Sequence, residues 1–176
     1  MHTRDEAEAR VWYETMHVAS VEGLVIKPVR SHYEMGVRGW QKYKYRASAE
    51  CVVGGYVGSP RRPSGLILGR YDRTGRLRVV GRTTRLTTQA AAELAPLFVP
   101  VSGAHPWPVP LPPGWAGSPY GQHEPITYTP VQPEVVVEVL VDTAVEKGRH
   151  RHPVKLLRVR TVLEPAHVIE QRSAVA

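Results

Sequence analysis

Cysteine is almost absent from this sequence, which holds a single one, Cys51, in 176 residues. One cysteine cannot form an internal disulfide, so we expect Cys51 to be a small buried apolar residue in a reducing, cytoplasmic setting. Long apolar runs are also lacking, and none approaches the ~18 to 20 residues that a membrane-spanning helix needs. The opening residues, MHTRDEAEAR, show no apolar segment of a secretory signal. We therefore predict neither a disulfide framework nor membrane insertion.

Acidic residues are outnumbered, and the excess positive charge is concentrated in one segment. The net charge of the chain is +7. Residues 46–85 contain only two acids, Glu50 and Asp72, against nine arginines: Arg46, Arg61, Arg62, Arg70, Arg73, Arg76, Arg78, Arg82 and Arg85. The rest of the chain is close to neutral. A basic block in a strand-rich region favours a polyanion partner, most simply nucleic acid backbone. A soluble arginine-rich surface without a partner is the alternative.

The apolar periodicity predicts a mainly β protein with two helices. A helix is expected over residues 4–16, capped by Thr3 or Asp5, and a short one over residues 88–94, capped by Thr87. The expected strands cover residues 21–29, 40–46, 49–58, 64–71, 76–83, 134–142 and 154–160.

Glycine and proline mark the turns and the irregular parts of the sequence. The turn at residues 72–75 predicts a hairpin, and the glycines at 54, 55 and 58 predict a bend or bulge. Residues 96–133 hold eleven of the sixteen prolines, so we expect an irregular excursion, packed in part through Trp107 and Trp115. The tail from Glu164 is expected to be frayed. Five strands with a helix after the third match the OB-fold, a five-stranded Greek-key barrel; an SH3-like barrel is the alternative.

Two short segments carry the chemistry that the sequence suggests: EGLVIK at residues 22–27 and WQKYK at residues 40–44. Side chains alternate along a strand, so Trp40, Lys42 and Lys44 share one face, and the Cα atoms of the two lysines lie ~7 Å apart. Neighbouring like charges repel, and a phosphate between them would remove that conflict. Lysines on a strand are also typical of a solvated sheet edge, where they deter edge pairing.

These two segments, in this order, resemble motifs IV and V of the covalent nucleotidyltransferases, the superfamily of ATP-dependent DNA ligases and mRNA capping enzymes. The following AECVVGGYVG and GLILGRYDRTGRLRVVGRTT resemble the opening of the OB domain of bacterial ligases, and EVVVEVLVD with RHRHPVKLLRVR resembles its end. The chain is most similar to the C-terminal part of ligases of actinobacterial type, HPWP included, from about residue 10 to about residue 165. The resemblance implies three parts: a remnant of the adenylation domain at residues 1–46, an OB-fold domain at residues 47–165 with a Pro-rich insertion at 96–133, and a tail at 166–176.

The resemblance also implies roles for individual residues. Lys42 and Lys44 would contact the α-phosphate of ATP, and Lys27 would face the same phosphate. Glu22 matches an acidic residue near the nucleotide and its Mg²⁺. The arginine that orients the pyrophosphate in the family has two candidates, Arg158 and Arg160, although Val162 stands where relatives usually carry an acid. The expected contacts to the DNA backbone are Arg46, Arg70, Arg73, Arg76, Arg78, Arg82 and Arg85.

The lysine that starts the family's chemistry is missing. These enzymes attack ATP with the lysine of a K-x-D-G motif, and none of the five lysines here is followed by x-Asp-Gly. We therefore assign no catalytic residue and expect no self-adenylation by this chain alone. One hypothesis is a ligase-like protein for nick sealing in DNA repair, replication or recombination, inactive alone or joined by an upstream chain with K-x-D-G. The other is a stand-alone OB-fold module that binds nucleic acid without catalysis. The ligase-like barrel sequence disfavours the capping-enzyme branch.

Two further groups of residues have plain structural explanations. His150 and His152 suggest an exposed basic loop rather than a metal site, because no cysteine or acidic cluster lies near them in the sequence. Tyr33, Tyr43 and Tyr45 could stack on bases, although strand tyrosines usually pack.

Overall fold

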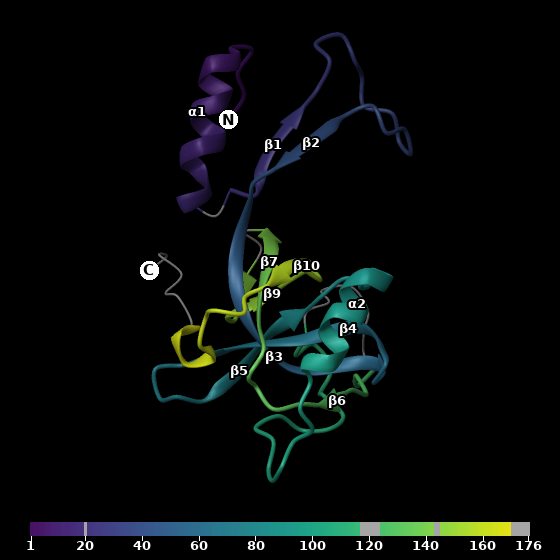
Figure 1. Ribbon diagram of the computed structural model, residues 1–176. Coiled ribbons are helices and arrows are strands. Elements are labelled where there is room, and N and C mark those ends of the chain that lie inside the picture. Colours follow the sequence, from purple (N-terminus) through teal and green to yellow (C-terminus); the bar gives the residue numbers. More distant parts are fainter. Residues whose placement is uncertain (20, 117–123, 143–144, 170–176) are drawn as a thin grey trace.

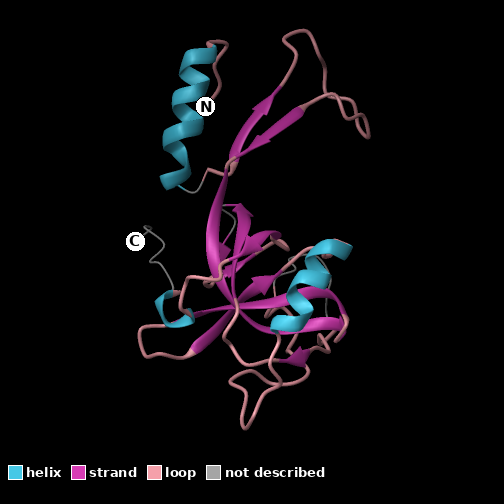
Figure 2. Cartoon of the chain, in the orientation of Figure 1, coloured by secondary structure: helices cyan, strands magenta, loops and turns pink. Residues whose placement is uncertain are grey.

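The structure is a computed structural model that describes residues 1–19, 21–116, 124–142 and 145–169. It is mainly β, which confirms the expected fold class, and its named sheets are antiparallel. A helix and a two-stranded hairpin stand above a larger sheet, and strand β3 runs from the hairpin into that sheet (Figure 1). Strands and loops make up most of the sheet region, with short helices at its edges (Figure 2). No helix among the described residues has the length and apolar character to cross a membrane.

The amino-terminal part consists of α1 (Glu6–Thr15), a 3₁₀ turn η1 (Met16–Ala19) and the hairpin of β1 (Gly23–Ile26) and β2 (Gln41–Lys44). Asp5 caps α1, and its carboxylate accepts hydrogen bonds from the backbone N–H of Ala7 (2.7 Å) and Glu8 (3.3 Å). Both strands are shorter than predicted, since Pro28 and the long loop after it end the pairing.

Five strands form the large sheet in the order β10-β7-β3-β4-β5. Their bounds are β3 (Arg46–Ser59), β4 (Arg62–Tyr71), β5 (Leu77–Arg82), β7 (Val136–Asp142) and β10 (Lys155–Val159), and a sixth, β6 (Thr129–Pro130), pairs with β3. The strands predicted by sequence are thus found close to their expected positions.

The edge strands β5 and β10 approach each other without forming a ladder. They meet at one parallel bridge between Thr83 and Val154, where the Val154 N–H donates to the carbonyl of Arg82 (2.9 Å). The described strands therefore form an antiparallel sheet whose ends touch at one point, and not the closed barrel that was expected. Closure requires two strands to run side by side over several residues, and here contact is confined to the residues just after β5 and just before β10.

Glycines in β3 produce the bend that the sequence predicted. The register of the β3–β4 ladder shifts between Val53 and Gly55 and again between Val57 and Gly58. Gly54 is required by packing as well, because a Cβ there would lie 2.3 Å from the Trp107 ring.

The segment between β5 and β7 begins with α2 (Thr88–Leu94) and a 3₁₀ turn η2 (Ala95–Leu97). The Thr87 hydroxyl caps α2 by accepting a hydrogen bond from the Ala90 N–H (3.2 Å), as predicted. The Pro-rich stretch then runs irregularly across the sheet. Trp107 is buried within it and donates from Nε1 to the carbonyl of Leu77 (2.8 Å). Residues 117–123 of the stretch lie outside the described residues.

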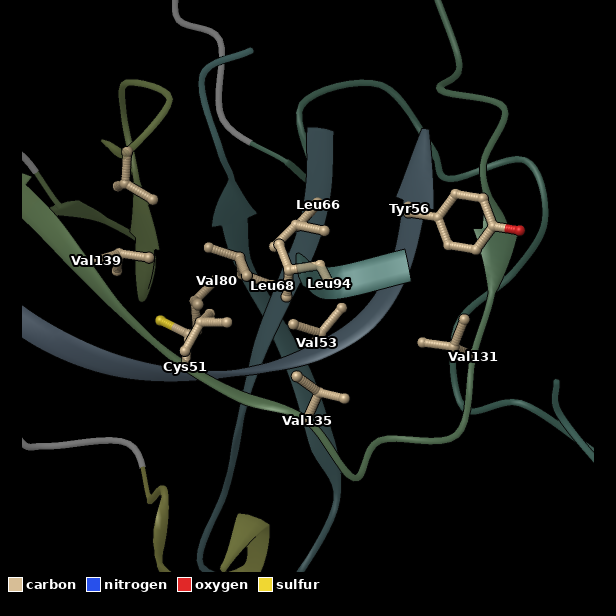
Figure 3. Close-up of a cluster of buried hydrophobic side chains, with 12 residues drawn as sticks. Cys51, Val53, Tyr56, Leu66, Leu68, Val80, Leu94, Val131, Val135 and Val139 are labelled. Atoms are coloured by element: carbon tan, nitrogen blue, oxygen red, sulfur yellow. The ribbon is translucent and has the colours of Figure 1, made fainter. Parts of the chain in front are cut away.

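Each face of the large sheet carries a cluster of buried apolar side chains. Successive residues of β3 and β4 contribute to opposite clusters because strand side chains alternate between the two faces. One cluster contains Cys51, Val53, Leu68 and Leu94 (Figure 3). The other contains Val52, Ile67 and Trp107 and lies under the Pro-rich stretch. Cys51 is fully buried, as expected, and burial raises the pKa of its thiol.

Three features near the carboxyl end were not anticipated. A small hairpin, β8 (Val145–Glu146) and β9 (Arg149–His150), precedes β10, and a 3₁₀ turn η3 (Pro165–His167) follows it. Val168 is buried, and its carbonyl accepts a hydrogen bond from the Tyr71 N–H (2.9 Å). The prediction of a frayed tail from Glu164 is therefore wrong as far as residue 169. Residues 170–176 lie outside the described residues.

Candidate nucleotide and nucleic-acid site

The hairpin of β1 and β2 positions the two lysines that the sequence singled out. Lys42 lies opposite Val25 and Lys44 lies opposite Gly23 in the antiparallel register, so both project from the same face of β2. Lys42 is exposed and makes no ion pair or hydrogen bond with any described residue. Its ammonium group is therefore available to an anion.

Lys44 is held loosely between two carboxylates. Its Nζ lies 3.9 Å from Glu22 Oε2 and 3.7 Å from Asp142 Oδ2 on β7. Both separations exceed hydrogen-bond length, so these are weak ion pairs at a partly solvated site. Asp142 also accepts from His152, whose Nδ1 lies 3.1 Å from Oδ2. The sequence analysis did not assign Asp142, because β7 and the hairpin are about a hundred residues apart.

Lys27 and Glu22 lie at opposite ends of β1. The Lys27 ammonium sits 4.0 Å from the centroid of the Trp40 ring, a cation–π contact that fixes its direction. Glu22 is half-buried, and its carbonyl accepts from the Tyr45 N–H (2.8 Å). Lys27, Lys42 and Lys44 therefore all belong to one hairpin.

Tyrosine rings tie this hairpin to α1. Tyr13 packs against Tyr43 at 4.8 Å and against Tyr45 at 5.7 Å between ring centroids, and His17 stacks on Tyr45 at 4.2 Å. Tyr43 and Tyr45 therefore pack, whereas Tyr33 remains 70% exposed beside Trp40.

The arginines of β4 and β5 face one another. Arg70 and Arg78 are direct cross-strand partners, which places two like charges together. The conflict is relieved because Arg70 donates from Nε to the carbonyl of Glu50 (2.9 Å) and Arg78 donates to Asp72 (2.7 Å). Both side chains are therefore partly committed to internal contacts.

The turn between β4 and β5 is organised by one carboxylate. Asp72 accepts from the Thr74 hydroxyl, the backbone N–H of Arg76 and the guanidinium of Arg78, which together hold its pKa well below the usual range. Arg73 and Arg76 are both exposed on this turn. Arg46 and Arg85 are also exposed, and Arg82 is half-buried. The turn thus presents, on a rigid support, two cations that make no ion pair with any residue the structure describes.

Arg158 and Arg160, at the end of β10, share an acid. Arg158 Nε lies 2.7 Å from Glu138 Oε2, and Arg160 Nη1 lies 3.5 Å from the same oxygen. The Arg158 guanidinium lowers the pKa of Glu138. Arg160 also lies 3.9 Å from Glu50.

A groove of about 400 Å³ runs between α2 and β10. Arg85 and Arg158 line it together with Thr87, Glu93 and the exposed Leu157. The fold thus brings a predicted DNA-backbone arginine and a predicted pyrophosphate arginine to one groove, which strand patterns alone did not indicate.

The histidine pair differs from its prediction. His150 is not in an exposed loop but is buried against Gly81, and burial lowers the pKa of its imidazole to about 4, with the charge of Arg70 adding to the effect. The exposed-loop prediction failed because His150 belongs to β9, whose inward face packs on β5. Among the described residues no three His, Cys, Asp or Glu side chains gather as a metal site.

Comparisons with known proteins give a consistent result. DNA ligase C of Mycobacterium tuberculosis is 32% identical to 93% of this chain, and DNA ligase C1 of Mycolicibacterium smegmatis is 29% identical over the same share. The chain spans about half the length of these curated relatives, 49% and 47%. No protein-family model matches it.

Solved structures point the same way. The ligase domain of M. tuberculosis LigD superposes with a TM-score of 0.57 at 25% identity, covering 90% of this chain and 50% of that domain. A mycobacterial DNA ligase D complexed with ATP and MES gives a TM-score of 0.50 at 25% identity over the same shares. Over nine tenths of its length, this chain is thus related in sequence and in fold to about half of an ATP-dependent DNA ligase.

Proposed function

We propose that this chain is the DNA-binding and phosphate-contacting part of a DNA ligase, and that the adenylated lysine comes from other residues. The observation that carries the proposal is the single face of β2 with Lys42 and Lys44, directly ahead of an arginine-rich sheet. Relatives that are DNA ligases support this assignment.

The contacts of the hairpin lysines suit an α-phosphate. Lys42 carries an uncommitted charge, and the two carboxylates near Lys44 lie beyond hydrogen-bond distance. A phosphate oxygen within hydrogen-bond reach would make a shorter and stronger charge-assisted contact than either carboxylate makes now. Lys27, directed by Trp40, would add a third positive charge to the same hairpin.

ATP and Mg²⁺ fit this site only in part. Mg²⁺ is commonly held by one or two carboxylates together with substrate phosphates and waters. Glu22 supplies one carboxylate, and Asp142, the other acid near Lys44, is already engaged with His152. Glu22 would therefore hold the ion only together with the phosphates of ATP. The bound ion would neutralise part of the charge of the triphosphate.

The hairpin also supports a polypeptide partner that would carry K-x-D-G. Ile26 and Tyr43, on the hairpin face opposite Lys42, are 51% and 57% exposed. Apolar side chains that share an exposed face often mark a surface that another polypeptide covers. The covering residues would resemble the half of the ligases that this chain does not match, as a separate chain or as more of the same polypeptide.

Duplex DNA would lie on the arginine-rich sheet, and the protein would bind it without recognising its base sequence. Arg73 and Arg76 stand on the rigid turn after β4, and Arg85 lines the groove between α2 and β10. Arginine contacts to phosphate position a protein on a duplex without base readout.

Salt-dependent binding tests the DNA assignment. We expect the chain to bind nicked duplex DNA with an affinity that falls steeply with salt, and we expect Arg73→Gln with Arg76→Gln to reduce the log–log slope by about 2. Arg10→Gln, which removes a charge paired with Glu6 on α1, is the control and should leave the slope unchanged. Equal slopes for all three proteins would exclude this surface.

Labelling with radioactive ATP tests whether the adenylated lysine comes from residues outside this chain. The chain with ATP and Mg²⁺ should stay unlabelled, because none of its lysines lies in K-x-D-G. A ligase fragment that carries K-x-D-G should become labelled more readily when this chain is added. Lys42→Ala with Lys44→Ala should lower that gain at least about a hundredfold, since two lost charged contacts of about 1.5 kcal/mol each sum to about 3 kcal/mol. Acid-stable label on the chain alone would refute the proposal.

A stand-alone nucleic-acid-binding module is the second candidate function, favoured by the arginine-rich sheet alone. It predicts the same salt-dependent DNA binding, but no effect of ATP and no gain in labelling of any added fragment.

A further inference from the structure

A second hollow, of about 290 Å³, has no residue of the β1–β2 hairpin among its described lining residues. It is bounded by β5, by the Pro-rich stretch and by the turn of the small β8–β9 hairpin. Two tryptophans, Trp107 and Trp115, line it together with three cationic side chains, Arg78, Lys147 and Arg149, and no acid is among its lining residues in the described part of the chain.

The aromatic wall of this hollow is fixed in place. Trp107 is 4% exposed and is held by its Nε1 hydrogen bond to the Leu77 carbonyl. Backbone packing leaves no room behind the indole, because a Cβ at Gly54 or Gly69 would lie 2.3 Å or 2.6 Å from it. Trp115 is half-buried beside it, and its backbone N–H donates to the Pro112 carbonyl (3.2 Å).

The cationic wall is also well ordered by its backbone. Lys147 and Gly148 have φ values of +50° and +75°, and the register pairs Glu146 with Arg149. This is a two-residue hairpin turn with positive φ at both central residues, a geometry that matches strand twist. The turn holds Lys147 at its tip, and the buried His150 anchors the strand that follows.

The charges of this wall remain largely unneutralised. The Arg149 guanidinium carbon lies 4.9 Å from the centroid of the Trp115 ring, and neither Arg149 nor Lys147 forms an ion pair with a described residue. Arg78 is bonded to Asp72, so it contributes less. A half-exposed indole next to two free cations matches the way proteins bind nucleotides, through base stacking and phosphate contacts together.

We propose that this hollow binds an unpaired nucleotide, with the base stacked on Trp115 and its phosphate held by Lys147 and Arg149. The ligand is either a nucleotide of a single strand or a free mononucleotide, which share this chemistry. The described lining of the site includes neither Lys42 nor Lys44, and only the identification of the strand as DNA rests on the proposed function.

Tryptophan fluorescence of the intact chain tests the proposal. Single-stranded oligo-dT should quench the emission and bind measurably at low salt, and thymidine monophosphate in a parallel titration separates the two sources of ligand. Trp115→Leu keeps an apolar side chain but removes the stacking surface, so the quenching should disappear and oligo-dT affinity should fall about tenfold. Trp12→Phe on α1 removes another tryptophan and should keep both the quenching and the affinity.

Variants that remove a positive charge test the phosphate contacts through oligo-dT affinity, independently of the Trp115 indole. Lys147→Gln should weaken oligo-dT binding and lower its salt slope by about 1. Arg149→Lys should retain more affinity than Arg149→Gln, since it keeps the charge. Unfolding temperatures of all variants show whether each one is folded. If folded Trp115→Leu shows full quenching and unchanged oligo-dT affinity, Trp115 does not stack on a base. The contact between Arg149 and Trp115 is then only structural, and the proposal is overturned. Loss of nicked-duplex binding in Arg73→Gln with Arg76→Gln, with oligo-dT quenching intact, would separate this site from the proposed duplex surface.

Discussion

Every buried side chain in the described part of the chain lies at Cys51 or beyond it, whereas the described residues 1–45 bury none completely. The large sheet carries two apolar clusters, one on each face. The helix α1 and the β1–β2 hairpin expose Val11, Val25 and Ile26 by about half of their surface. The two regions contain similar apolar residue types, but these side chains are buried in the sheet and about half exposed in the helix and hairpin.

The difference lies in what stabilises each region. The sheet is stabilised by removal of apolar surface from water, at roughly 25 cal/mol per Å². The helix and hairpin rely on local contacts: the Asp5 cap, the β1–β2 ladder and the rings of Tyr13, Tyr43 and Tyr45. Short helices and isolated hairpins are marginal in water, so the covering segment proposed above would stabilise this region more than the sheet.

The largest difference in the free energy of unfolding is expected when a large apolar side chain is replaced by alanine in each of the two regions. Leu68→Ala, at a fully buried position, should lower the free energy of unfolding by about 2–5 kcal/mol. Ile26→Ala, at a position that is 51% exposed, should cost less than about 1 kcal/mol. Urea unfolding followed by circular dichroism measures both. A similar cost for the two would mean that the hairpin is packed as tightly as the sheet.

Added volume should separate the regions as well. Gly54→Ala places a methyl group against the Trp107 indole and should cost about 3 kcal/mol, the upper end of the usual cost of overpacking. Gly39→Ala meets no atom within 4 Å and should be neutral or slightly stabilising. Thermal unfolding of the two variants checks the pair, and a tolerated Gly54→Ala would contradict the fixed position of Trp107.

A pH effect is expected from the sheet region through His150. Its pKa is about 4 in the folded chain and about 6.5 when unfolded. The unfolded chain therefore binds the extra proton between these values, so stability is fully present above about pH 6.5 and is lost as pH falls toward 4. The loss between pH 7 and pH 5 should be about 2 kcal/mol. Urea unfolding of His150→Gln at both pH values should show a smaller loss, and an equal loss would assign the effect to other groups.

The smallest effect compares two helix caps. Asp5→Ala and Thr87→Ala each remove a cap worth about 1 kcal/mol. Because α2 buries Leu94, the loss at Thr87 should appear in global unfolding. The loss at Asp5 should appear as faster amide exchange in α1, with the unfolding of the sheet unchanged. Equal effects of both variants on global stability would show that α1 folds together with the sheet.

Strand positions were predictable because side chains alternate with a period of two and glycines mark the turns. The turn at residues 72–75 has Gly75 at φ +74°, and the Thr87 cap and the bulges of β3 appear where expected. The division into parts at 1–46, 47–165 and 166–176 stays a prediction, as do the roles of the site residues. The barrel closure and the frayed tail were not predicted correctly, because each depends on contacts between distant segments.

The sequence by itself determined where the charge lies, which residues alternate on β2, and that no lysine stands in K-x-D-G. These properties are local, since they depend on residue type and on neighbours along the chain. Only the tertiary structure decided that Asp142 approaches Lys44, that Arg149 lies over Trp115 and that His150 is buried. Each of these contacts joins residues of different elements, and their separation is set by how strands pair and loops pack rather than by neighbours along the chain.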